Sequence, residues 1–203
     1  TYAVGSTSYV HWNDNAINSG DGGVSNSFWS ASEKLIYAYS GSTFYGGYNG
    51  KAIGDFPGMS LSDNLRYIGT DSQQTLNLNI DRTNYTGNFD ISLGGGNDGI
   101  NSAKFKNGDK LDAGAGDDTV YIMVSGSSGT PSFTSLDMAK LDGGAGIDTL
   151  SFEESSTGGE EINLSRGGAV NFENLRGTSQ GETVRGNSGD NTLFGVGGAD
   201  TLY

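Results

Sequence analysis

The chain contains no cysteine, so neither disulfide bonds nor thiolate metal sites can stabilise it. Only 2 of its 203 residues are proline and only one is histidine, and no apolar run is long enough to suggest a membrane-spanning helix. Hydrophobic residues make up 33% of the sequence, and the formal net charge is −13. An acidic chain of this kind repels the phosphates of nucleic acids but attracts divalent cations. We therefore expect no nucleic-acid partner and no insertion into a membrane.

Glycine and aromatic residues are abundant instead. The sequence has 35 glycines, 10 tyrosines, 9 phenylalanines and 2 tryptophans. Low apolar content together with high net charge is typical of disordered chains, but disordered chains are poor in aromatic residues. The composition therefore predicts a folded, β-rich protein that needs a stabilising element besides its hydrophobic core, and without cysteine that element would be a metal ion.

A nine-residue pattern recurs in the second half of the chain. It reads G-G-x-G-x-D-x-U-x, where U is apolar, and it is a known calcium-binding β-helix repeat. A degenerate copy, GTSQGETVR, covers residues 177–185 in the same frame. The clearer copies are LGGGNDGIN (93–101), AGAGDDTVY (113–121), GGAGIDTLS (143–151), GNSGDNTLF (186–194) and GVGGADTLY (195–203).

The spacing of this repeat suits calcium. Ca²⁺ takes six to eight oxygen ligands, and the glycine-rich half lets the backbone curl so that its carbonyl groups face a common point. The aspartate adds a carboxylate, and the x-U-x half is a short strand with one apolar side chain facing the interior. These arguments predict Asp98, Asp118 and Asp148 as the first ligands, Asp200 as the next and Asn191 as a weaker one.

Other residues of the turns belong to the same prediction. Asp112 and Asp142 each lie just before the glycine-rich turn, and this recurrence indicates either a shared ligand or a role in fixing the turn. The backbone contribution is expected from the paired glycines of three copies, which are Gly94, Gly96, Gly114, Gly116, Gly144 and Gly146.

The distances between copies indicate insertions. Two nonapeptides form one coil of 18 residues, but Asp118 follows Asp98 by 20 residues and Asp148 follows Asp118 by 30. We therefore expect the stretch around Asp148 to be an isolated calcium staple within a larger domain rather than one rung of a uniform ladder. Only residues 177–203 have the regular spacing of a plain roll.

Residues 1–90 carry no nonapeptide, and their short apolar and aromatic runs predict antiparallel strands joined by long loops. TLNLNI (75–80) alternates with period two, as a half-buried strand does, whereas TSLDMAK (134–140) is a candidate for one helical turn. The segment around His11, Asp14 and Asp21 is open to two interpretations, a further calcium loop or an ordinary polar loop.

One loop in this half is a candidate recognition surface. The stretch STFYGGYNG places Phe44, Tyr45 and Tyr48 among glycines, and exposed tyrosines give contact area at low entropic cost. The alternative is that these rings pack on the core.

The expected fold is all-β with a minor helix. We expect residues 1–176 to form a β-sandwich-like, ligand-binding domain with embedded calcium-binding β-roll turns. Residues 177–203 would then begin a C-terminal β-roll. A catalytic role is poorly supported, because the sequence has a single histidine and no H-E-x-x-H motif, and nothing singles out a pair of carboxylates. The chain is therefore expected not to be an enzyme.

The stretches LDAGAGDDTVYI, LDGGAGIDTLSF and NFENLRGTSQGETVRGNSGDNTLFGVGGADTLY resemble repeats-in-toxin (RTX) proteins of Gram-negative bacteria. The likeness covers about residues 93–203. It implies secretion by a type I system that reads a C-terminal signal, location outside the cell or on its surface, and folding on contact with external calcium. A chain that begins without methionine and stops within a repeat is then expected to be a piece of a longer protein.

Interrupted repeats beside an aromatic β domain look most like the calcium-dependent peptide-binding domain of RTX adhesins. That resemblance implies several bound Ca²⁺ ions and a module, itself monomeric, that grips peptide or protein C-termini on host or partner cells. Two alternatives remain: a calcium-dependent sugar-binding module of an adhesin, and a structural or secretion β-roll of an RTX exoenzyme.

Overall fold

The computed structural model describes residues 58–76, 82, 84–101, 104–123, 137–153, 161–165 and 167–203 in full. It gives the backbone alone for residues 77–78 and 102–103 and for five strands between residues 2 and 46. The described chain is nearly all β, as predicted. Its strands are β1 (Tyr2–Val4), β2 (Thr7–His11), β3 (Ser27–Ser30), β4 (Leu35–Ala38), β5 (Thr43–Gly46), β6 (Leu65–Thr70), β7 (Thr75–Leu78), β8 (Phe89–Gly94), β9 (Gly99–Ala103), β10 (Lys110–Asp112), β11 (Thr119–Met123), β12 (Leu141–Asp142), β13 (Thr149–Glu153), β14 (Glu161–Asn163), β15 (Asn174–Arg176), β16 (Thr183–Arg185), β17 (Thr192–Phe194) and β18 (Thr201–Leu202).

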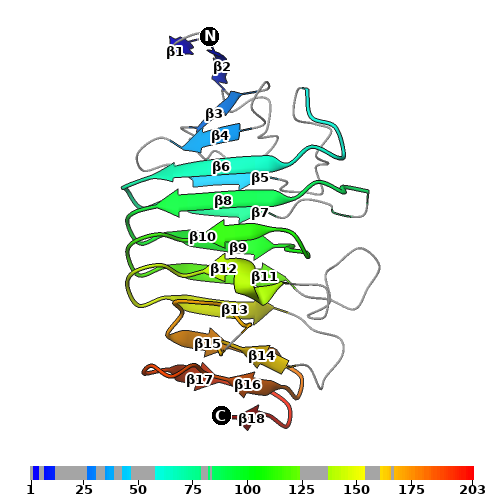
Figure 1. The fold of residues 1–203 in the computed structure, drawn as a ribbon, viewed down its shortest axis with the longest axis vertical. Coiled ribbons are helices and arrows are strands. Elements are labelled where there is room, and N and C mark those ends of the chain that lie inside the picture. The colour runs from blue at the N-terminus through cyan, green and yellow to red at the C-terminus, as the bar shows by residue number, and fades with distance from the viewer. Residues whose placement is uncertain are drawn as a thin grey trace.

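From β4 onward, consecutive strands alternate between parallel sheets, so that each pair of strands forms one coil of a stack (Figure 1). The first sheet runs β4-β6-β8-β10-β12 and the second runs β5-β7-β9-β11-β13-β15-β17. After β12 the strands β14, β16 and β18 form a third sheet, which takes the place of the first sheet in the alternation. Antiparallel pairing among the described strands is confined to β1–β2, β2–β3 and β3–β4.

Two expectations need correction here. Residues 1–90 were expected to form antiparallel strands. The strands β1 to β4 do pair in this way, but β4, β6 and β8 pair in parallel, and so do β5 and β7. Alternation along TLNLNI shows that the segment is a strand, yet says nothing of the direction of its neighbours. The stretch that holds Asp148 was expected to be isolated, but β13 pairs with β11 on one side and with β15 on the other. Insertions are accommodated between strands, so the ladder itself is not interrupted.

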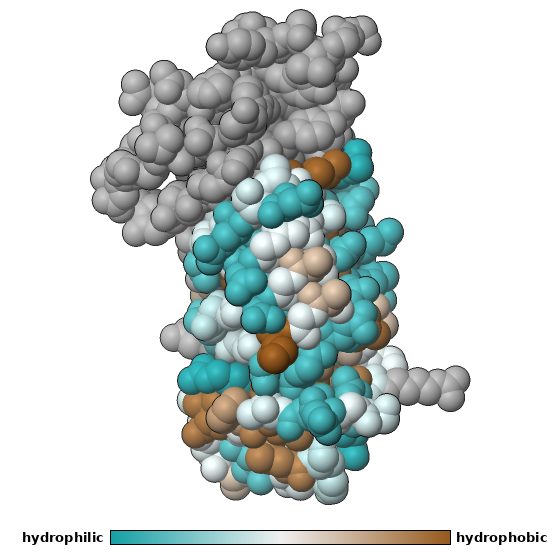
Figure 2. All heavy atoms as spheres, turned by 90° about the vertical axis from the view of Figure 1, so that its left-hand side faces the viewer, coloured by the Kyte–Doolittle hydropathy of each residue, from teal (hydrophilic) through white to brown (hydrophobic). Residues whose placement is uncertain are grey.

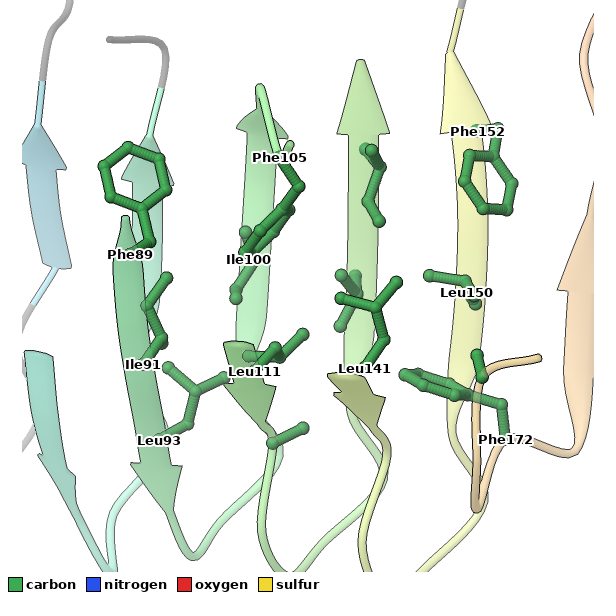
Figure 3. Packing of buried hydrophobic residues seen from close by; sticks show 14 of the residues in the cluster. Phe89, Ile91, Leu93, Ile100, Phe105, Leu111, Leu141, Leu150, Phe152 and Phe172 are labelled. Carbon is green, nitrogen blue, oxygen red and sulfur yellow. The ribbon is translucent and has the colours of Figure 1, made fainter. Parts of the chain in front are cut away.

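The hydrophobic core lies between the sheets and is built from ladders of equivalent side chains (Figure 3). In the second sheet, Ile100, Val120 and Leu150 occupy the same register and are 0% exposed. These are the U positions of the nonapeptide, so their predicted inward orientation is confirmed. Phe89, Phe105, Phe152 and Phe172 are, together with Tyr67, the largest fully buried side chains of the described chain. Burying such side chains stabilises the stack by about 1.5–3 kcal/mol each.

The coils differ in length, and the difference falls in the connections. Equivalent residues of successive coils are 24, 20, 30, 25 and 18 residues apart along the chain. The 30-residue coil includes the 3₁₀ helix η3 (Met138–Lys140), within the segment predicted to contain a helical turn. Strand pairing continues across residues 176 and 177, because β15 pairs with β13 and with β17. The division into two units at that point remains a prediction.

Candidate metal centre

Four turns of equal length, 70–74, 94–98, 114–118 and 144–148, lie one above another on one side of the molecule. We call them the turn stack. They connect β6, β8, β10 and β12 to the second sheet, and parallel bridges link Gly95 to Ala115 and Ala115 to Ala145. Figure 2 looks at this side of the molecule, where hydrophilic residues flank a centre of intermediate hydropathy and hydrophobic residues gather toward the C-terminal end.

Glycine is required in this stack by both conformation and space. A Cβ atom on Gly114 would lie 1.9 Å from the carbonyl oxygen of Gly94, and one on Gly144 would lie 1.9 Å from that of Gly114. The backbone angle φ is also positive there, in a region that side chains disfavour. The turns can therefore approach one another only through bare backbone. All six predicted glycines have positive φ: Gly94, Gly96, Gly114, Gly116, Gly144 and Gly146.

Hydrogen bonds between a side-chain oxygen and a backbone N–H link the last residues of successive turns into a continuous column. We call Asp98, Asp118 and Asp148, which lie in this column, the acidic ladder. Oδ1 of Asp118 accepts the backbone N–H of Asp98 at 2.7 Å, and Oδ1 of Asp148 accepts that of Asp118 at 2.8 Å. At one end, Oδ1 of Asp98 accepts the N–H of Gln74 at 2.6 Å. At the other, Oε2 of Glu173 accepts the N–H of Asp148 at 2.8 Å. The three predicted aspartates are thus brought into one column.

The second carboxylate oxygen of each aspartate in the ladder is buried and lacks a hydrogen-bond partner. Asp98, Asp118 and Asp148 are only 4%, 1% and 0% exposed, and Oδ2 of each is unpaired. Desolvation by burial raises the pKa of all three above the ordinary value and brings the pKa of Asp98 and of Asp148 to about 7. A buried ionised carboxylate is unfavourable unless it is paired. These carboxylates are therefore stable in the folded chain only when they are protonated or paired with a cation.

The available donors fit a hard cation such as Ca²⁺. The three turns 94–98, 114–118 and 144–148 each offer a carboxylate oxygen and a glycine-rich backbone whose carbonyl groups carry no side chains between them. Among the described residues, no group of three or more acidic or histidine side chains gathers at one point. Any ion held here would accordingly take most of its ligands from backbone carbonyls or water, which Ca²⁺ accepts readily.

The other predicted ligands have different roles or places. Oδ1 of Asp142 accepts the backbone N–H of Gly144 at 3.0 Å and an amide N–H of Asn171 at 2.7 Å, which is the turn-fixing alternative. Asp112 is exposed on β10, beside Asp142 of β12 in the register. Oδ1 of Asp200 accepts the backbone N–H of Glu182 at 3.0 Å in a different column of turns. Neither Asp112 nor Asp200 belongs to the acidic ladder.

Asn191 occupies the next position beyond Glu173 in the column. Its Oδ1 accepts the backbone N–H of Asn187 at 2.7 Å, and its amide nitrogen lies 3.5 Å from the carbonyl oxygen of Glu173. Sequence reasoning missed Glu173 itself, although GAVNFENLR (168–176) stands in frame with the following copies and has glutamate at the sixth position. The nine-residue frame could have revealed Glu173, but the pattern as written accepts only aspartate at the sixth position.

The carboxylate of Asp109 is also buried, but it lies outside the turn stack and has its hydrogen-bond partners within the chain. Asp109 is 1% exposed, and its Oδ1 accepts hydrogen bonds from Arg82 Nη2 at 3.0 Å and from the backbone N–H of Phe89 at 2.8 Å. Oδ2 accepts the N–H of Lys106 at 2.7 Å. The guanidinium carbon of Arg82 lies 3.9 Å from the centre of the Phe89 ring and 4.7 Å from that of Tyr85. Nothing in the nonapeptide pattern points to this site.

The predicted aromatic recognition loop cannot be placed. Phe44 and Tyr45 lie in β5, for which only the backbone is given, and Tyr48 lies outside the described residues, as do His11, Asp14 and Asp21 apart from the backbone of His11. No helix in the described part of the chain is sufficiently long and apolar to cross a membrane. Comparisons with protein-family models, with curated proteins and with solved structures gave no match.

Proposed function

We propose that this chain is a calcium-binding β-roll module of a secreted RTX-type protein, and that Ca²⁺ bound along the turn stack holds its coils together. The observation that carries the proposal is the set of three buried aspartates, each with one unpaired oxygen, in turns that only glycine can form. Cations bound there would neutralise charges that otherwise oppose the stacking. Folding would then depend on the high calcium concentration outside the cell.

Within this proposal, the chain's own residues prepare the site. The hydrogen bond to Oδ1 fixes the orientation of each carboxylate and leaves Oδ2 for the ion. The buried Ile100, Val120 and Leu150 hold the strands in register, so that the aspartates one residue before each strand fall in line. When Ca²⁺ is bound it supplies positive charge and a coordination shell; the module itself is proposed to have no catalytic role.

Calcium titration of two matched variants tests the proposal. Asp118→Asn keeps an oxygen for the Asp98 N–H but replaces the second oxygen with an amide, so calcium affinity should fall at least tenfold. Asp117→Asn removes the same charge from the neighbouring exposed residue and should change affinity little. Isothermal titration calorimetry measures both. Equal loss in the two variants, or no calcium binding by the unaltered chain, would contradict the proposal.

As the partner of this module we propose a peptide or protein C-terminus on a host or partner cell, because the RTX-adhesin resemblance and the Tyr-rich stretch 42–50 favour it. The acidic composition supports a bound cation rather than Lys or Arg as the receptor for a peptide carboxylate. Calorimetry with free C-terminal peptides should show binding in calcium that is lost on amidation. Binding that amidation leaves intact would exclude this mode, and binding of sugars on a glycan array would favour the lectin alternative.

A further inference from the structure

The first turn of the stack, residues 70–74, occupies the position of a calcium turn but has a different chemistry. Thr70 pairs in register with Gly94, and the carbonyl oxygen of Gln74 accepts the N–H of Gly99 just as that of Asp98 accepts the N–H of Thr119. Gln74 is therefore the structural equivalent of the aspartates in the ladder. Its turn reads TDSQQ, so glutamine replaces the aspartate, and no glycine is present.

The side chain of Gln74 fills the centre of its own turn. Its amide nitrogen Nε2 donates to the carbonyl oxygen of Thr70 at 3.0 Å, lies 3.1 Å from Thr70 Oγ1 and also donates to the carbonyl oxygen of Ser72. Its Oε1 accepts the N–H of Thr70 at 3.1 Å. Only the nitrogen end can serve two carbonyl acceptors, so these contacts fix the orientation of the amide. Gln74 is 1% exposed.

The carbonyl groups that Gln74 contacts are the counterparts of carbonyl groups in the calcium turns. The carbonyl oxygen of Thr70 accepts the N–H of Gly95 at 2.8 Å, as that of Gly94 accepts the N–H of Ala115 at 2.9 Å. Thr70 and Ser72 are absent from the residues with positive φ, whereas Gly94 and Gly96 have φ of 99° and 97°. In the first turn, the carbonyl groups of Thr70 and Ser72 therefore both accept hydrogen bonds from the Gln74 amide of the same turn.

We propose that the column of calcium ions ends at this turn, because the Gln74 carboxamide takes the place that a cation has in the following turns. This inference rests on the proposed function and sharpens it. An amide satisfies the converging carbonyls while leaving no buried charge, so the first coil needs no ion. A Cβ atom at position 69 would lie 1.8 Å from the carbonyl oxygen of Leu93 and 2.3 Å from Gln74 Oε1, so the backbone of the next coil requires glycine there and the Gln74 amide adds to the crowding.

Conversion of the first turn into a calcium turn tests this inference. The triple variant Thr70→Gly, Ser72→Gly, Gln74→Asp gives the turn the glycines and the acid of residues 114–118 without changing its length. It should bind one more Ca²⁺ per chain than the unaltered protein. Two matched controls should bind no additional ion: Thr70→Gly with Ser72→Gly, which lacks the acid, and Gln73→Asp, which adds a charge at the exposed neighbour. Native mass spectrometry counts the ions.

The outcomes separate the two proposals. If the unaltered protein binds no calcium, the proposed function fails. If it binds calcium and a triple variant with unchanged circular dichroism takes up no additional ion, only the present inference fails. An additional ion in the Gln73→Asp control would also overturn it, because charge alone would then suffice.

A measurement on the unaltered protein keeps the inference falsifiable if the triple variant does not fold. Hydrogen–deuterium exchange of peptides that cover residues 65–76 should change little, less than twofold in rate, when calcium is removed. Exchange of peptides that cover residues 113–122 should become at least tenfold faster. Equal acceleration in both segments would overturn the assignment of Gln74 as an internal substitute for the ion.

Discussion

Asp109 and Asp118 are equally buried, at 1% exposed, but they are stabilised in opposite ways. Both oxygens of Asp109 have partners within the chain, and one of these is the guanidinium of Arg82. Asp118 has a backbone partner for Oδ1 and none for Oδ2. One carboxylate has its counter-ion within the chain, and under the proposed function the counter-ion of the other is Ca²⁺.

Under the proposed function, the fold around Asp109 is stable without calcium, whereas the fold around the acidic ladder depends on calcium. A buried charge is tolerated only when it is paired. Arg82 supplies that pairing at all times, and the rings of Tyr85 and Phe89 pack against its guanidinium. The acidic ladder has no such cation among the described residues, so the repulsion and desolvation of its ionised carboxylates oppose folding, and under the proposed function a bound cation relieves both. Calcium dependence should accordingly belong to the ladder and not to the Arg82–Asp109 pair.

Removal of calcium should have the largest effect on the stability of the protein. Each ion present at 100 times its dissociation constant contributes about 2.7 kcal/mol to stability, so three occupied turns would contribute about 8 kcal/mol. Circular dichroism melting in calcium and in chelator measures the loss, and Mg²⁺ should restore little because it keeps its water shell. Identical melting curves in calcium and chelator would remove the basis for the distinction between the two aspartates.

Loss of the internal counter-ion should be the next largest effect. Arg82→Met leaves Asp109 buried without its cation and should destabilise the protein by about 3–5 kcal/mol. The loss should be similar at saturating and at low calcium, as chemical denaturation would show. Arg66→Met is the control: it removes an exposed ion pair in which Arg66 Nε lies 3.8 Å from Asp90 Oδ2, and it should lower stability by less than about 1 kcal/mol. A calcium-dependent effect of Arg82→Met would mean that the two sites are coupled.

A methyl group between two calcium turns should have a smaller but selective effect. Gly144→Ala meets the carbonyl oxygen of Gly114 and has φ of 94°, so we expect a loss of about 3 kcal/mol together with weaker calcium binding. Gly167→Ala is the control, because Gly167 has φ of 85° but nothing within 4 Å, and should cost about 1–2 kcal/mol. Thermal melting and calcium titration of both variants measure this. Equal calcium affinity in the two would show that close stacking of the turns is not required.

The smallest expected effect is a pH dependence that reverses with calcium. In the metal-free protein the pKa of Asp98 and of Asp148 is about 7, above the ordinary 3.8, because burial disfavours their charge. The neutral form therefore favours folding, and this stability is full near pH 4 and is lost as the pH rises through 7. In chelator, melting temperature should rise from pH 8 to pH 5.5. In calcium it should fall, because protons displace the ion.

Asp148→Asn is the matched variant for the pH experiment. Asparagine stays neutral at every pH, so part of the rise in chelator should disappear. An unchanged pH profile in this variant would assign the effect to other groups.

The nonapeptide pattern was sufficient to predict the turns, the aspartates of the ladder and the buried apolar position of β9, β11 and β13, whereas the equivalent Leu202 of β18 is 47% exposed. These features depend on about nine consecutive residues, so a local pattern contains them. Glu173 and Gln74 escaped the pattern because other residues replace the aspartate. The frame of the following copies could have revealed Glu173, whereas the equivalence of Gln74 appears only when the coils are superposed by strand pairing.

The Arg82–Asp109 pair could not be predicted for a different reason. The two residues are 27 positions apart, and they meet because β8 and β10 are neighbours in the first sheet. Nothing at either position signals the partner. The expectation of antiparallel strands across residues 1–90 was wrong from β4 onward on similar grounds, since alternation along a segment identifies it as a strand but does not identify its neighbours.

The sequence by itself determined the local chemistry: which turns are free of side chains, where a carboxylate stands, and which side chain of each strand faces the core. Only the tertiary structure decided which carboxylate meets which partner. Coil lengths between 18 and 30 residues leave the register open, and burial of equivalent apolar side chains across coils sets it. That register aligns Asp98, Asp118 and Asp148 in one column, places Gln74 at its end and gives Asp109 to Arg82.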